Sequence, residues 1–113
     1  MAAAADLTGT TYTKSTLVTC DAAVAYRCRA VNLPKNARRV RICFRGGPGT
    51  MTQGRTGDYT DGTTDLTGYD YYAAESTFEI AAPESGTIFL GHSALSGVCV
   101  VTPVFDDAIG YML

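Results

Sequence analysis

Few residues in this chain of 113 residues could carry out catalysis. The single histidine, His92, lies in the Gly- and Ser-rich segment 91–97, close to Ser93 and Ser96. A Ser-His-Asp triad could be composed from these side chains, but no G-x-S-x-G nucleophile elbow is present. The surrounding residue types predict instead that His92 is a surface residue of a turn. We therefore expect a protein without enzymatic activity.

Four aspartates in a Gly- and Thr-rich stretch are the candidates for metal chemistry: Asp58, Asp61, Asp65 and Asp70. Carboxylates on such a loop can bind Ca²⁺, although the spacing of an EF-hand is absent. Carboxylate pairs also serve glycosidases, but the chain has no Trp to form a sugar platform. The pattern favours solvated loop carboxylates, with calcium binding as the alternative. We expect no metal and no cofactor.

Four cysteines permit three disulfide pairings, among which the sequence does not choose: Cys20, Cys28, Cys43 and Cys99. No two of them have the close spacing of a zinc site. The first residues lack the basic and apolar regions of a signal peptide, so reduced thiols are expected. Because a free cysteine packs as a small hydrophobe, we expect buried thiols.

Charge is unevenly divided along the chain, although its net value is only −2. Eight of the nine basic residues fall between Arg27 and Arg55, and nine of the eleven acidic residues fall between Asp58 and Asp107. In a folded domain the two halves could interleave. Alternatively, they form opposite poles that let copies tile head to tail. No segment approaches the roughly 18 apolar residues of a membrane span, so no membrane partner is expected.

The clearest predicted strand runs from Arg38 to Arg45. Apolar side chains alternate along it with the residues Arg39, Arg41, Cys43 and Arg45. Because neighbouring side chains of a strand point to opposite faces, one face belongs to the core and the other carries arginines. An arginine face could meet nucleic acid, an acidic protein surface or solvent. The small net charge and the acidic second half argue against nucleic acid.

The other segments also have the composition of strands, separated by turn signals. Residues 23–31 are compatible with a strand or a short helix, and 50–70 with two short strands carrying a long exposed loop. The remaining expected strands are 11–18, 71–72, 77–80, 87–90 and 98–102, with turns at 32–37, 46–49 and 83–86. Short strands at this spacing predict an all-β fold, a single small β-sandwich or jelly-roll-like domain. The expected organisation is an N-terminal arm (1–9), a β-sandwich domain (10–103) and a C-terminal tail (104–113).

Residues 30–103 show a characteristic order of turns, strands and loops. The turn at Pro34 leads into the strand 38–45, Gly-rich acidic loops follow, and the strand 98–102 ends in Pro103. In this arrangement the chain resembles small structural proteins of tailed bacteriophages, in particular capsid decoration (cement) proteins, which clamp neighbouring capsomers. The resemblance implies a virion location after assembly in a host cytoplasm. It implies as partners the major capsid protein and copies of the chain itself, and it assigns no individual functional residue.

Partner contacts are expected from arginines of the predicted strand and from aromatic side chains: Arg39, Arg41, Arg45, Tyr69, Tyr71, Tyr72, Phe105 and Tyr111. Tyrosine is favoured at protein contacts, although the three central tyrosines could equally pack inside the sandwich. Two other functions fit the same pattern. One is a carbohydrate- or receptor-binding β-module that uses Tyr and the loop aspartates. The other is a tail or head-completion component of a virion.

Overall fold

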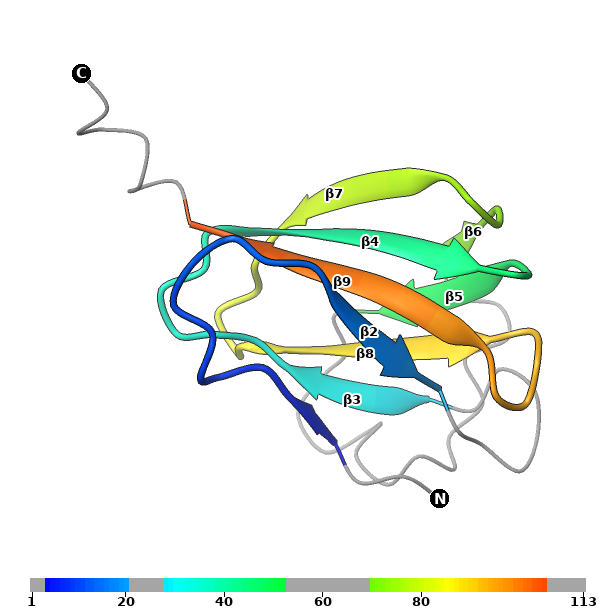
Figure 1. Cartoon of the computed structure of the whole chain (residues 1–113), viewed down its shortest axis with the longest axis horizontal. Helices are drawn as coiled ribbons and strands as arrows, with labels where there is room; N and C mark the ends of the chain where they lie inside the picture. Colours follow the sequence, from blue (N-terminus) through cyan, green and yellow to red (C-terminus); the bar gives the residue numbers. More distant parts are fainter. Residues whose placement is uncertain (1–3, 21–27, 53–69, 106–113) are drawn as a thin grey trace.

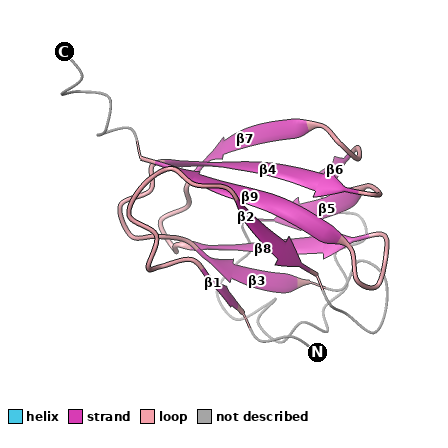
Figure 2. Cartoon of the chain, viewed as in Figure 1, coloured by secondary structure: helices cyan, strands magenta, loops and turns pink. Residues whose placement is uncertain are grey.

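The computed structural model describes residues 4–20, 28–52 and 70–105, and every regular element in these ranges is a strand (Figures 1 and 2). Five strands form one sheet in the order β1-β3-β8-β5-β6, and four form a second sheet in the order β2-β9-β4-β7. The two sheets pack face to face, which confirms the predicted all-β sandwich. The strands are β1 Ala5–Asp6, β2 Thr16–Thr19, β3 Arg29–Asn32, β4 Arg39–Arg45, β5 Gly49–Thr52, β6 Asp70–Tyr72, β7 Thr77–Ala81, β8 Thr87–His92 and β9 Val98–Val104.

Successive strands alternate between the two layers. Within the described ranges only β5 and β6 follow one another in the same sheet. All pairs are antiparallel except β1 with β3, which run parallel. The longest pairing joins β4 to β9, strands that are more than fifty positions apart in the chain. The fold therefore depends on contacts between segments distant in sequence, a property that slows the folding of all-β domains.

The core lies between the two sheets. Its centre is formed by every second side chain of β4. Val40, Ile42 and Phe44 are completely buried, as their spacing predicts. The five-stranded sheet meets them with apolar side chains of four strands: Val31, Met51, Ile88, Leu90 and the half-buried Tyr72. Full burial of one such side chain contributes about 1.5–3 kcal/mol to folding. The alternation of β4 thus determines which sheet face points inward.

An aromatic cluster closes the sandwich where β6 and β7 are the edge strands. The rings of Tyr72 and Phe78 stack with centroids 3.7 Å apart and planes 6° from parallel. Phe44 packs beside both, at 6.5 Å from Tyr72 and 6.3 Å from Phe78. Because Tyr72 belongs to one sheet and Phe78 to the other, the stack joins the two layers. Burial, followed by the nearby Asp70 carboxylate, raises the pKa of the Tyr72 phenol.

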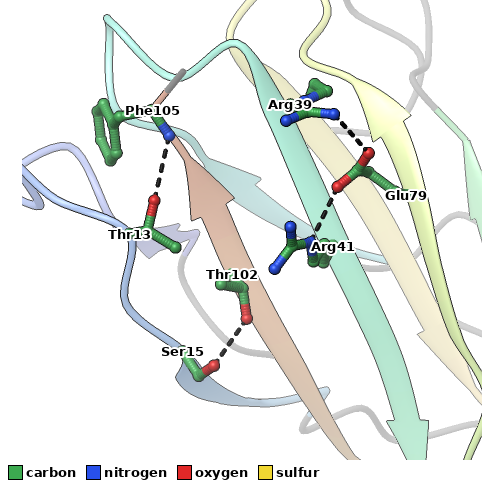
Figure 3. A network of polar contacts seen from close by, with 7 residues as sticks. All are labelled: Thr13, Ser15, Arg39, Arg41, Glu79, Thr102 and Phe105. Atoms are coloured by element: carbon green, nitrogen blue, oxygen red, sulfur yellow. Dashed lines mark hydrogen bonds and ion pairs between the residues drawn. The ribbon is translucent and has the colours of Figure 1, made fainter. Parts of the chain in front are cut away.

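The strand predicted for residues 11–18 is displaced, since β2 covers Thr16–Thr19. Before β2 the chain is held to the end of β9 by side-chain hydroxyls (Figure 3). The hydroxyls of Ser15 and Thr102 are 2.8 Å apart, and the Phe105 N–H donates to Thr13 Oγ1 at 3.2 Å. Ser and Thr side chains offer the backbone such alternatives to ladder bonds. The same shortness of β2 leaves the end of β9 without a ladder partner on that side, a position that tolerates Pro103.

The first strand begins at Ala5 and the last ends at Val104. Ala5–Asp6 pairs with β3, and Leu7 is buried in the core, so part of the segment 1–9 belongs to the sandwich. Strand β9 continues to Val104, which is also buried. In the middle of the chain β3 begins at Arg29, later than the predicted strand 23–31. Residues 21–27 and most of the acidic loop lie outside the described part of the chain.

The prediction that His92 is a surface turn residue is wrong. His92 is the last residue of β8 and only 2% exposed, with its ring edge-on to Phe44 at a centroid distance of 6.0 Å. The Ala94 N–H donates to Nδ1 at 2.9 Å, and Nε2 lies 2.8 Å from the Arg45 carbonyl oxygen. Since Nδ1 accepts, the neutral ring must carry its proton on Nε2 and donate it to Arg45. Two backbone groups therefore balance the burial of this polar ring.

We expect Gly97→Ala to destabilise the domain, because a Cβ at this position would overlap the His92 ring. Relieving such an overlap in a packed interior typically costs about 1–3 kcal/mol. The free energy of unfolding in urea measures the effect. Gly9→Ala is the matched control, since a Cβ there meets no atom within 4 Å. Equal stability of the two variants would contradict the packing of His92 described above.

Candidate functional site

The side of the four-stranded sheet that faces away from the core is the candidate site, and we call it the outer face. The strand registers place one row of side chains straight across it, from Leu17 through Val100 and Cys43 to Thr77. Leu17 is 70% exposed, while Val100 and Cys43 are half-buried. The outer face as a whole comprises Leu17, Thr19, Arg39, Arg41, Cys43, Arg45, Thr77, Glu79, Ala81, Val98, Val100, Thr102 and the buried Val104.

The three predicted arginines of β4 lie on the outer face and are held by glutamates. Glu79 on β7 receives the Arg39 Nη1–H at 3.0 Å and the Arg41 Nε–H at 2.9 Å, as Figure 3 shows. Arg45 donates from Nε to Glu75 Oε1 at 2.6 Å. The outer face is therefore a mixed-charge surface rather than the purely cationic one that the sequence suggests. Exposed ion pairs of this kind contribute little to stability, with a median of about 0–1 kcal/mol.

Glu75 is held by its backbone as well as by its side chain. It is the only described non-glycine residue with positive φ, at 63°, and its N–H donates to the Phe44 carbonyl oxygen at 2.8 Å. Its second carboxylate oxygen accepts from the Gly46 N–H at 2.7 Å. That backbone hydrogen bond lowers the pKa of the Glu75 carboxyl, and Arg45 acts in the same direction. A residue in this region of φ persists where surrounding contacts determine it, so Glu75 fixes the position of Arg45.

A shallow hollow lies in the outer face beside the row of uncharged side chains. Its volume is about 230 Å³, several times the roughly 30 Å³ of a water molecule. Arginine, hydroxyl and apolar groups line it: Ser15, Arg41, Cys43, Thr77, Val100 and Thr102. An apolar centre with charged groups around it is the arrangement of a protein–protein contact surface.

The described aromatic contact residues, Tyr71, Tyr72 and Phe105, do not gather with the arginines. Tyr71 is 63% exposed on β6, an edge strand of the opposite sheet, and Tyr72 is occupied by its stack with Phe78. Phe105 is half-buried just after β9. Tyr69 and Tyr111 lie outside the described residues. Among the expected contact residues that the structure describes, only the arginines lie together.

Sequence reasoning missed the apolar members of the outer face and the two glutamates. One signal was available, because Glu75 and Glu79 are separated by four positions, as are Arg41 and Arg45. Opposite charges with equal spacing on neighbouring antiparallel strands can pair at both ends. The register between β4 and β7 makes the pairing visible, whereas the sequence alone does not show that these strands are neighbours.

The four cysteines are free thiols, as expected, but they differ in burial. Cys20, Cys28 and Cys99 are buried, whereas Cys43 is half-buried on the outer face. Burial raises the pKa of the Cys20 thiol to about 12, and burial likewise raises that of Cys99. Since the thiolate is the reactive form, Cys20 and Cys99 are protected both by their surroundings and by their protonation.

Two further features bear on the predicted chemistry. In the ranges 4–20, 28–52 and 70–105, no three His, Cys, Asp or Glu side chains lie close enough to hold a metal ion. Asp58, Asp61 and Asp65 are outside these ranges, so the calcium alternative concerns residues that the structure does not describe. No helix in the described part of the chain is long and apolar enough to cross a membrane.

Comparison with known proteins gives no relative. No protein-family model, no curated protein and no solved structure matches this chain.

We expect Cys43 to react with N-ethylmaleimide at neutral pH at least tenfold faster than the other three thiols of the folded protein, because it alone is accessible. Peptide mass spectrometry after timed labelling measures the four rates. In urea all four cysteines should react alike, which serves as the control. Labelling of Cys20 or Cys99 as fast as Cys43 in the native protein would contradict the described burial.

Proposed function

We propose that this chain is a non-enzymatic virion structural protein, a capsid decoration protein that binds the shell of major capsid protein and stabilises it. The single observation that carries the proposal is the outer face, with its uncharged row across four strands between groups of ion-paired arginines. Contact surfaces between proteins have such an apolar centre and polar rim. The resemblance of residues 30–103 to decoration proteins supplies the kind of partner.

The outer face suits an adhesive role because its side chains are held before a partner arrives. Glu79 fixes two arginines at once, and the backbone of Gly46 fixes Glu75 beside Arg45. Side chains that are already ordered lose less entropy on binding. The centre of the row, Val100 and Cys43, lies on β9 and β4, the two inner strands of the sheet.

The many identical binding sites of a capsid shell would strengthen the binding of a decoration protein. A shell presents many identical sites, and a decoration protein that also contacts copies of itself binds them with avidity. A modest affinity at each outer face is then sufficient to hold neighbouring capsomers together. The same many-fold contacts would raise the temperature at which the shell opens.

We expect the purified protein to cosediment with empty capsid shells of its own virus and to raise their temperature of disassembly. Leu17→Ser should weaken shell binding about tenfold, because burial of an exposed leucine contributes about 1.5–3 kcal/mol and 1.4 kcal/mol is a factor of ten. Leu95→Ser is the matched control, since Leu95 is also exposed, at 52%, but lies outside the four strands. Both measurements use sedimentation and light scattering during heating.

Absence of binding, together with shells that disassemble at the same temperature with and without the protein, would overturn the proposal. If the Leu17 and Leu95 variants lose shell binding equally, the outer face is not the surface that binds the shell.

A further inference from the structure

Two arginines of the outer face have unused hydrogen-bonding capacity. Arg41 and Arg45 each bond to a glutamate through Nε alone. Their terminal nitrogens have no partner among the described residues. Arg41 also shares the single Glu79 carboxylate with Arg39. A guanidinium group has a fork of N–H donors that matches a carboxylate, so each of these two arginines can donate to a further carboxylate.

The spacing of these arginines is set by the strand. They are four positions apart on the same face of β4, which corresponds to about 13 Å at the rise of a strand. Cys43 lies midway between them, in the row with Val100 and Leu17. The outer face therefore presents two cationic positions with an uncharged position between them.

The chain itself contains a segment with the complementary pattern. On the β7 side, Glu75 and Glu79 are four positions apart with Thr77 between them, and they meet Arg45 and Arg41 in antiparallel order. This neighbour occupies only the Nε side of each guanidinium. A second extended segment with the same spacing, lying over the outer face, would meet the terminal nitrogens.

We propose that the outer face binds an extended protein segment in which two carboxylates, four positions apart, flank an aliphatic side chain. The carboxylates bond to the terminal nitrogens of Arg41 and Arg45, and the aliphatic side chain enters the hollow beside Cys43. The pattern acidic-x-aliphatic-x-acidic reads the same in both directions, so either strand orientation satisfies it. This inference rests on the proposed function, for which it names the chemistry of the partner.

Nucleic acid fits the outer face less well than such a segment. A phosphate backbone would also bind arginine, but it offers no aliphatic group to the exposed Leu17 and to Val100. The uncharged centre of the outer face therefore favours a protein segment.

The direct test uses two synthetic peptides, acetyl-TDTITDT-amide and its uncharged counterpart acetyl-TNTITNT-amide, titrated into the ¹⁵N-labelled protein. We expect the first peptide to shift the backbone amide signals of Leu17, Cys43 and Val100, with a dissociation constant at least tenfold lower than that of the second. Its affinity should fall several-fold between low and high salt, because exposed charge pairs are screened. Equal binding of both peptides, shifts elsewhere on the protein, or no shift at 10 mM peptide would overturn the inference. Tighter binding of a single-stranded DNA oligonucleotide that displaces the peptide would overturn it as well.

Variants separate this inference from the proposed function. Arg41→Gln with Arg45→Gln should weaken both peptide and shell binding at least tenfold, while Lys35→Gln, which removes a charge outside the outer face, should not. If the double variant binds shells as tightly as the parent protein, the partner chemistry is wrong and the decoration role stands. If the parent protein binds the acidic peptide but no shells, the decoration role is wrong and the partner chemistry stands.

Discussion

The burial of three apolar side chains of β4 is the interaction on which the other features of this protein depend. Val40, Ile42 and Phe44 fill the centre of the sandwich and leave no exposed surface. Because side chains of a strand alternate, their burial forces Arg39, Arg41 and Arg45 to the opposite side. A shift of one residue in the register of β4 would bury the arginines and expose the core, so the packing specifies the register strongly. The outer face is thus a direct consequence of the core.

Two sets of side-chain contacts stabilise the surroundings of Phe44. The stack of Tyr72 on Phe78 joins the edges of the two sheets, and His92 contacts the ring from β8. The hydrogen bond from His92 to the Arg45 carbonyl fixes the end of β4, where the Glu75 carboxylate also holds the Arg45 guanidinium. Core packing and the position of an outer arginine are therefore coupled through a few residues at one end of β4.

Much of this architecture could be predicted from local sequence. The alternation in 38–45 identified β4 and its two faces, and the Gly- and Pro-containing turns placed most of the other strands. His92 was misassigned because its neighbours are typical of a turn, while two residues that hold its ring in the core, Phe44 and Arg45, are distant in the chain. The row from Leu17 to Thr77 could not be predicted, since it exists only through the registers of four strands. Which strands become neighbours is decided by packing across the whole domain.

The central claim is that the outer face is the surface that docks on a capsid shell, and the thiol of Cys43 lies at its centre. The most direct measurement is the rate at which N-ethylmaleimide labels Cys43 in free protein and in protein bound to empty shells, read by mass spectrometry of the peptide that contains it. The account predicts at least a tenfold slower rate in the bound protein, because the partner covers the hollow. An unchanged rate in protein shown to be bound would place the docking surface elsewhere and contradict the account.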